Sequence, residues 1–272
     1  ANEVGTGFWA EWNDLVHSIQ PQAYTTPEIW VEAPDFIREG KFDGVMNYYA
    51  FAMPVKGGLI DGTLPIRDFV RLIEERRKKF TEEEIPLLQN LFDSHDTDRM
   101  PSMIVNRDRP YYAKSEAFAY DAEIWPGSHD KPYLIRKPDE TERKLQRMIV
   151  LFQMTYPGAP YIYYGTEAGM WGADDPDDRM PMVWADLKFE PQTLSPGGQP
   201  ARQDDINFDS TLHDYYRDAI ALRKKFPDLV HGKMQMIGAE NQSRTFAFAR
   251  TGAVTLVAVF NRHPEEQTFT FQ

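Results

Sequence analysis

The sequence predicts an α/β protein in which a parallel α/β region is followed by antiparallel strands. Short apolar runs of strand length alternate with amphipathic helices over residues 8–226. The run at residues 159–165 is nearly all apolar, which is typical of a parallel strand covered on both faces. After Pro227 apolar residues recur at every second position, which is typical of antiparallel strands joined by turns.

Two helices are predicted in the first third of the chain. The first covers residues 8–19, with Thr6 as its N-cap and Pro21 behind it. Its apolar stripe consists of Phe8, Trp9, Trp12, Leu15, Val16 and Ile19. The second covers residues 64–80 and directs Phe69, Val70, Ile73 and Phe80 inward. Its charged run EERRKK is interpreted as a solvated helix face rather than a nucleic-acid surface.

Four strands and two long connections complete the parallel region. The strands are predicted at residues 23–30, at 42–49, in a run that ends at Ser94, and at 159–165. Residues 100–139 show no period and exceed the usual length of a connection, which favours a functional loop. Helices at 139–156 and 210–226 flank a second irregular loop at 165–208, and antiparallel strands follow at 233–237, 245–249, 254–260 and 267–271, with a turn at 250–252.

Composition narrows the class of protein. The 272 residues are 42% hydrophobic and 13% aromatic, which suits a folded globular protein. A net charge of −12 argues against a nucleic acid or an anionic membrane as partner, because both attract basic surfaces. The absence of cysteine excludes disulfides and thiolate metal sites. No apolar run reaches the about 18 residues of a membrane span.

Polar side chains stand at the ends of the predicted parallel strands. Glu28 ends the first strand, Asn47 the second, His95 and Asp96 the third, and Glu167 lies just past the fourth. The carboxyl ends of parallel strands meet at one edge, where barrel enzymes carry their chemistry. The coincidence of all four strand ends therefore favours an active-site rim.

His95 and Asp96 alone are ambiguous. A charged pair behind a buried strand is explained equally well by a satisfied buried pair and by a catalytic one. The same Ser-His-Asp tripeptide recurs at residues 128–130 among Pro, Gly and charged residues, where it is interpreted as a loop. Neither copy is a hydrolase triad, since triad members meet through folding rather than adjacency.

Four motifs, in order along the chain, resemble those of the α-amylase family, glycoside hydrolase family 13. ANEVGTGFW at residues 1–9 resembles the tail of the fourth-strand motif as found in neopullulanase and cyclomaltodextrinase relatives, and PEIW at 27–30 resembles the fifth-strand motif. SHDTDR at 94–99 is similar to the Asn-His-Asp motif of the seventh strand, with Ser94 in place of Asn. Residues 157–184 resemble the eighth strand and its following loop.

The resemblance implies a fold and a division into domains. The chain would be the C-terminal half of a (β/α)8 TIM barrel followed by an incomplete antiparallel β-sandwich. Residues 1–227 would form the partial barrel, from the end of its fourth strand through its eighth helix, and residues 228–272 the start of the sandwich.

The resemblance also implies roles for the rim residues. Glu28 corresponds to the general acid/base and Asp96 to the carboxylate that stabilises the transition state. Residues implied to bind substrate are His95, Asn47, Tyr48, Trp30, Asp175 and Arg179. Arg99 and Glu167 would be structural neighbours of the site. No cofactor is expected. Calcium stays a possible ligand of the acidic run at residues 174–178 but is unsupported, because the run lacks the ligand spacing of a calcium loop.

The nucleophile of a retaining mechanism has no counterpart in the sequence. In the family this carboxylate lies in an Arg-x-Asp pattern just before the residues that resemble Ala1–Val4, and Glu3 at a helix entry does not replace it. We therefore expect an internal segment of a larger retaining hydrolase that acts on α-1,4-linked maltodextrins, cyclodextrins or pullulan and is inactive alone. Four strands cannot close a barrel of eight, so the missing N-terminal half or self-association should cover the open edges.

Two alternatives stay open at this point. A non-catalytic carbohydrate-binding or interaction half-barrel would bind an α-glucan oligosaccharide without cleaving it. A transglycosidase of the same family would transfer the sugar instead of hydrolysing it. Bacterial cytoplasm, periplasm and secretion are equally compatible with the sequence, as is any oligomeric state.

A first prediction concerns the polypeptide that precedes Ala1 in the whole protein. It should contain a short apolar strand with Arg-x-Asp, because a parallel barrel needs a strand there and the chemistry needs a carboxylate at its end. Sequencing the complete gene tests this. Asn, Ser or an apolar residue at the Asp position would favour the binding module.

Overall fold

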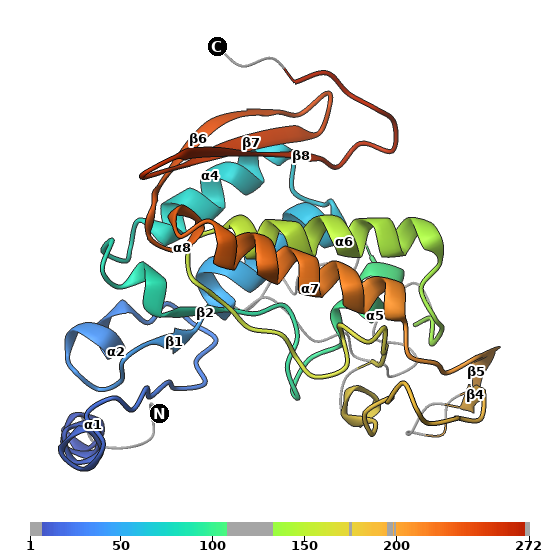
Figure 1. The fold of residues 1–272 in the computed structure, drawn as a ribbon, viewed down its shortest axis with the longest axis horizontal. Coiled ribbons are helices and arrows are strands. Elements are labelled where there is room, and N and C mark those ends of the chain that lie inside the picture. Colours follow the sequence, from blue (N-terminus) through green and yellow to red (C-terminus); the bar gives the residue numbers. More distant parts are fainter. Residues whose placement is uncertain (1–6, 108–132, 174–175, 195–197, 199, 270–272) are drawn as a thin grey trace.

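The computed structural model describes residues 7–107, 133–173, 176–194, 198 and 200–269. Helices α6 and α7 lie side by side across the middle of the molecule, with the sheet β6–β8 on one side of them and α1, α2 and β1 on the other (Figure 1). None of the helices in these ranges combines the length and the apolar character needed to cross a membrane.

The parallel sheet forms as predicted, but its strands are short. β1 (Val45–Met46), β2 (Leu88–Asn90) and β3 (Ala159–Pro160) pair in parallel in the order β1-β2-β3. The second, third and fourth predicted strands are thus correct in place and direction and too long in extent. The second is cut short because the chain passes at Asn47 into a π-helix, Tyr48–Ala52.

The first predicted strand, residues 23–30, is wrong as a strand. The segment is extended and lies beside β1, where Thr25 O accepts hydrogen bonds from Asp43 N and Gly44 N, and Pro27 O accepts one from Met46 N. Pro27 has no N–H to donate, so a regular ladder cannot continue through it. The segment therefore occupies the place of a strand without forming one.

The helices of the parallel region form where the sequence predicts them. α4 (Ile66–Arg77), α6 (Glu140–Thr155) and α7 (Ser210–Lys225) form where expected, and Asp139 and Asp209 cap the last two. α1 (Phe8–Ile19) also forms, behind Gly7, and the predicted cap Thr6 lies outside the described residues.

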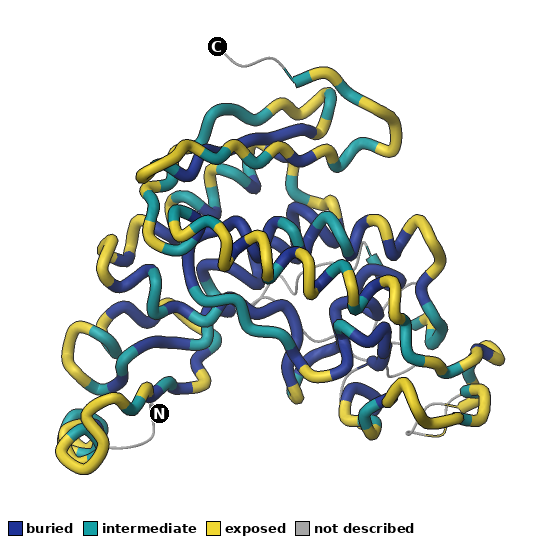
Figure 2. Tube along the Cα trace, in the orientation of Figure 1, coloured by how far each residue is buried: buried dark blue, intermediate teal, exposed yellow. Residues whose placement is uncertain are grey.

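The apolar stripe of α1 is only partly buried. Phe8, Leu15 and Ile19 are 50%, 59% and 77% exposed, and α1 is largely yellow in Figure 2. The described chain packs only Trp9 and Trp12 against the ring of Phe42. The described chain therefore covers only part of the stripe.

The two long connections contain elements that the sequence pattern did not predict. α5 (Met100–Val105) lies in the stretch 100–139, of which residues 108–132 fall outside the described ranges. A hairpin of β4 (Gln192–Leu194) and β5 (Pro200–Asp204) lies in the loop 165–208. These elements are too short for a hydrophobic period to show.

The remaining short elements are α2 (Pro34–Arg38), α3 (Met53–Val55), a second π-helix (Lys56–Asp61), 3₁₀ turns at Ile85–Leu87 and Asp177–Arg179, and α8 (Asp228–His231).

The C-terminal sheet is antiparallel, as predicted. β6 (Lys233–Glu240), β7 (Thr245–Thr251) and β8 (Thr255–Asn261) pair in that order. The predicted strand 267–271 is wrong at residues 267–269, which have no regular structure, and residues 270–271 are outside the described ranges. Phe269 instead places its ring beside Gly238 of β6.

One aromatic core joins the two regions. Phe246 of β7 and Phe260 of β8 pack edge-on against Phe152 of α6 at ring-centroid distances of 5.9 Å and 5.5 Å. Phe246 also contacts Phe69 of α4 at 5.5 Å. Because these rings are fully buried, the sheet is fixed against the helices, and the division of the chain at residue 227 stays a prediction.

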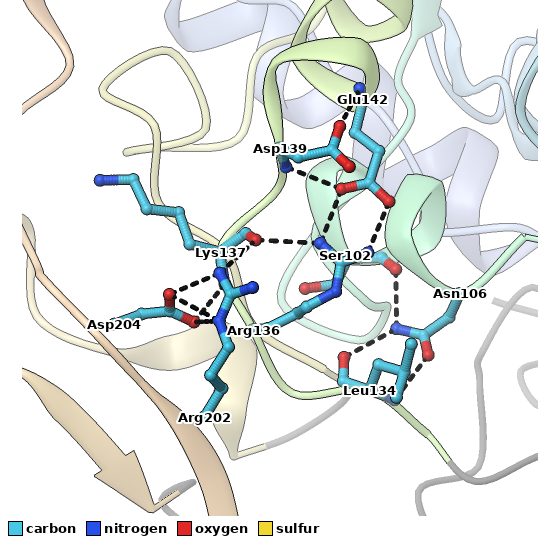
Figure 3. Close-up of polar contacts among 9 residues, drawn as sticks. All are labelled: Ser102, Asn106, Leu134, Arg136, Lys137, Asp139, Glu142, Arg202 and Asp204. Atoms are coloured by element: carbon cyan, nitrogen blue, oxygen red, sulfur yellow. Dashed lines mark hydrogen bonds and ion pairs between the residues drawn. The ribbon is translucent and has the colours of Figure 1, made fainter.

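A polar network fixes the segment before α6 (Figure 3). Arg136 makes two hydrogen bonds of 2.7 Å to Glu142, which also accepts from Asp139 N in a capping box. Asp204 of β5 accepts from Lys137 N at 2.9 Å and pairs with Arg202. The network therefore ties the hairpin β4–β5 to the start of α6.

A second prediction follows for Glu142. Glu142→Ala removes the capping-box hydrogen bond to Asp139 N and a half-buried ion pair, and should lower the free energy of unfolding by about 2–4 kcal/mol. Glu142→Gln keeps a capping side chain and should cost less. Urea denaturation measures both variants. Glu140→Ala, which removes an exposed ion pair with Arg147, should stay within about 0.5 kcal/mol, and a loss equal to that of Glu142→Ala would contradict the role of the network.

Candidate active site

Three of the predicted rim residues meet in one cluster. Glu28 lies on the extended segment beside β1, and His95 and Asp96 lie in the loop between β2 and α5. One ligand-type atom from each side chain lies within 4.8 Å of the others. Two of the four predicted strand-end positions, Glu28 and the pair His95–Asp96, thus come together.

The carboxyl of Glu28 is set up to stay protonated. Partial burial raises the pKa of Glu28, and the hydrogen bond to Asp96 and the charge of Asp96 raise it further. His95 and a hydrogen bond from Trp30 act in the opposite direction without reversing the rise in pKa. A carboxyl with a raised pKa is what a general acid needs near neutral pH.

Asp96 is paired with Arg179 and lies beside His95. Arg179 donates from Nη2 to Asp96 Oδ1 at 2.9 Å and from Nε to the carbonyl oxygen of His95 at 2.9 Å. The Nε2 atom of His95 lies 3.4 Å from Asp96 Oδ2. Both oxygens of Asp96 therefore face side chains that can donate a hydrogen bond. Arg179, predicted from the sequence, is thus part of the cluster.

Ser94 shapes the turn that presents Asp96. Its hydroxyl accepts a hydrogen bond from Asp96 N at 3.2 Å and another from the hydroxyl of Tyr48 at 2.8 Å. Its amide donates to Thr97 Oγ1 at 2.9 Å. These bonds explain why polar residues follow a buried apolar run. They close a tight turn whose groups are satisfied by one another.

Trp30 is a half-buried aromatic residue beside Glu28. Its ring stacks on that of Tyr48, with centroids 3.9 Å apart and planes at 11°. Tyr48 is fully buried beneath it, so Tyr48 supports the platform rather than lining the rim. The predicted substrate contact thus fits Trp30 and not Tyr48.

Asn47 is also placed inside rather than on the rim. It is 4% exposed, donates to Asn90 Oδ1 at 2.8 Å, and accepts from Ala50 N at 3.1 Å to cap the π-helix. The expected sugar contact at Asn47 is therefore not supported, because packing occupies both ends of the amide. Asp175, the remaining predicted contact, lies outside the described residues, as do the copied pair His129 and Asp130.

Arg99 and Glu167 lie near the cluster without joining it. Arg99 is fully buried, donates to Tyr164 O at 2.6 Å, and has its guanidinium over the rings of Tyr163 and Tyr164. Glu167 is half-buried behind β3. Both positions are compatible with the structural roles expected of them.

Asp93 is an important residue that sequence reasoning missed. It is buried, and its Oδ2 accepts from Met100 N at 2.9 Å and from Thr166 Oγ1 at 2.7 Å. Burial is the main cause of the raised pKa of this carboxyl. The signal was present in the sequence, since an acid directly behind Leu91 and Phe92 must be buried with partners.

The cluster is better suited to acid chemistry than to a metal. Glu28, His95 and Asp96 are the one group in the described ranges whose ligand-type atoms lie close enough to hold an ion. However, Arg179 already neutralises Asp96, and the raised pKa of Glu28 disfavours the anion that a metal needs. The acidic run 174–178 is described only in part, with Asp177 and Asp178 buried.

Comparison with known proteins identifies relatives of the chain. Residues 114–232 match the family described as the alpha amylase catalytic domain. Neopullulanase 2 of Thermoactinomyces vulgaris is 31% identical over 273 residues, covering 100% of this chain and 37% of that protein. Cyclomaltodextrinase of Geobacillus thermopakistaniensis is 30% identical, covering 97% of this chain and 36% of that protein.

A solved structure shows the same fold. A cyclomaltodextrinase superposes with a TM-score of 0.71 at 26% identity, over 96% of this chain and 36% of the other. The chain thus spans just over a third of the length of these relatives, and its fold is a partial (β/α)8 barrel with an antiparallel sheet behind it. The chain is therefore similar over residues 114–232 to the alpha amylase catalytic domain, and over nearly its whole length to parts of proteins named neopullulanase and cyclomaltodextrinase.

Proposed function

We propose that the protein of which this chain is part is a retaining α-glucan hydrolase acting on maltodextrins, cyclodextrins or pullulan. The observation that carries the proposal is the contact between Glu28 and Asp96. A carboxyl with a raised pKa is hydrogen-bonded to a second carboxylate that an arginine holds. The names of the relatives support the substrate class, since they refer to pullulan and to cyclic maltodextrins.

Glu28 would act as the general acid. Its proton goes to the glycosidic oxygen as the bond to the anomeric carbon breaks, so the leaving sugar departs as an alcohol. Trp30 would pack against a sugar ring beside that oxygen, since its stacked ring offers a flat apolar surface. After the leaving group departs, the anion of Glu28 would take a proton from the incoming water.

Asp96 would stabilise the positive charge that develops on the sugar ring. It is less suited to covalent attack, because Arg179 occupies one of its oxygens at 2.9 Å and His95 lies 3.4 Å from the other. His95 would donate a hydrogen bond to a sugar hydroxyl from its exposed side. The nucleophile would then be a further carboxylate supplied by the rest of the whole protein, about 5 Å from Glu28.

A third prediction concerns Glu28 in the complete protein. Glu28→Gln should lower kcat/KM on maltotriose by about 10²–10⁴-fold, because the variant cannot donate its proton. Binding of maltotriose, measured by calorimetry, should persist. A loss of activity below tenfold would exclude Glu28 as the acid, and loss of binding would point to a failure of the site itself.

A fourth prediction concerns Asp96 and the pH profile. Asp96→Asn should lower activity by about 10²–10³-fold. It also removes a negative neighbour that raises the pKa of Glu28. Because the acid must be protonated, the alkaline limb of the residual kcat/KM profile should move to lower pH.

The control for Asp96 is Asp130→Asn, in the second Ser-His-Asp tripeptide at residues 128–130. Its sequence context predicts no catalytic role, so both activity and pH profile should match those of the unaltered protein. Equal losses at the two positions would overturn the assignment of Asp96.

A further inference from the structure

A second cavity lies away from the candidate active site. It has a volume of about 230 Å³ and lies between the start of α4, the π-helix Lys56–Asp61 and the turn that joins β6 to β7. Its lining includes Gly62, Leu64, Ile66, Asn241, Arg244 and Arg262. None of these residues belongs to the Glu28–Asp96 cluster or supports it.

The charge around this cavity is strongly positive. Arg244 and Arg262 both line it, and the lining residues, all in the described part of the chain, include no carboxylate. The pKa of Arg262 is lowered to about 10, first by burial and then by the charges of Arg107 and Arg244. Asp61, the acid that acts on Arg262, is already bonded to Lys56 at 2.7 Å. Basic groups thus gather here in a chain of net charge −12.

The donors are held in place by the backbone. Arg262 donates from Nε to Leu59 O at 2.7 Å and from Nη2 to Ile60 O at 3.2 Å, which fixes its guanidinium beside the cavity. The amide of Arg262 donates to Arg244 O at 2.9 Å, so the two arginines remain neighbours. Arg244 has a φ of 50° in the turn, a conformation that few side chains adopt.

Asn241 adds a third donor. Its Oδ1 accepts from Arg67 N at 2.8 Å, which orients the side-chain amide. The Nδ2 group of the same amide is its hydrogen-bond donor. Arg67 itself is paired with Glu240 at 2.8 Å and contributes no spare charge.

We propose that this cavity binds a phosphate group, carried either by inorganic phosphate or by a small phosphomonoester. Two guanidinium groups and an amide can surround a tetrahedral dianion with charge-assisted hydrogen bonds. The cavity also leaves room beyond the phosphate for the sugar of a phosphomonoester. This inference does not depend on the proposed glycosidase activity, because no residue is shared.

Titration calorimetry at constant ionic strength, with chloride as the balancing anion, tests the proposal on the complete protein. Inorganic phosphate, glucose 6-phosphate and glucose are the three probes. Both phosphates should bind and glucose should not. Equal affinity of the two phosphates identifies the phosphate group alone as the ligand, and tighter binding of glucose 6-phosphate identifies a phosphomonoester. Binding of neither phosphate overturns the proposal.

Variants locate the site. Arg244→Gln removes an exposed side chain and should weaken phosphate binding by about tenfold or more, since hydrogen bonds to charged groups contribute about 1.5–3 kcal/mol. Arg217→Gln is the matched control, because Arg217 is an exposed arginine on α7 paired with Asp214. Circular dichroism verifies that both variants fold. Equal affinity of Arg244→Gln and the unaltered chain, or an equal loss in Arg217→Gln, would overturn the site.

Discussion

The buried carboxylate of Asp93 joins the three segments on which the candidate site depends. It follows β2, accepts the first amide of α5 through Met100 N, and accepts the hydroxyl of Thr166 from the loop behind β3. A buried carboxyl without partners costs several kcal/mol, so these bonds constrain the geometry strongly. The loop between Asp93 and Met100 carries His95 and Asp96. Fixing its two ends therefore fixes the site.

Support for this loop comes from the next residues in the chain. The hydroxyl of Ser94 closes the turn at Asp96 N, while Arg99 anchors the far end to Tyr164 O. Tyr48 reaches Ser94 from beneath Trp30. The segment that carries Glu28 and the loop that carries Asp96 are thus connected through packed and hydrogen-bonded groups.

The sequence predicted the long helices, from their hydrophobic periodicity, and the clustering of residues at the ends of the parallel strands. Helices α4, α6 and α7 have complete apolar stripes or caps such as Asp139, and these fix their position along the chain. Glu28, His95 and Asp96 could be predicted to lie close together, because the carboxyl ends of parallel strands meet at one edge. The burial of Asn47 and Tyr48 could not be foreseen, since it depends on the π-helix at Tyr48–Ala52 and on the stack under Trp30.

The shortest helices and strands, and the burial of the α1 stripe, could not be predicted from the sequence pattern either. β1 and β3 have two residues each, and α5 has six, which is less than the window in which a period can be recognised. Periodicity correctly predicted that α1 has an apolar face, but it does not identify the residues that pack against that face. Only the packing of Trp9 and Trp12 on Phe42 shows how much of it the described chain buries.

The two carboxyl groups of the site, those of Glu28 and Asp96, differ in the side chains that surround them. Asp96 contacts the guanidinium of Arg179, whereas Glu28 is partly buried beside Asp96 itself. The carboxylate of Asp96 raises the pKa of Glu28, because a nearby negative charge disfavours a second anion. Arg179 comes from the loop after β3, in a 3₁₀ turn far along the chain from PEIW. The place of Asp96 beside Glu28 therefore depends on the docking of that loop, so the C-terminal connection shapes the surroundings of the Glu28 carboxyl.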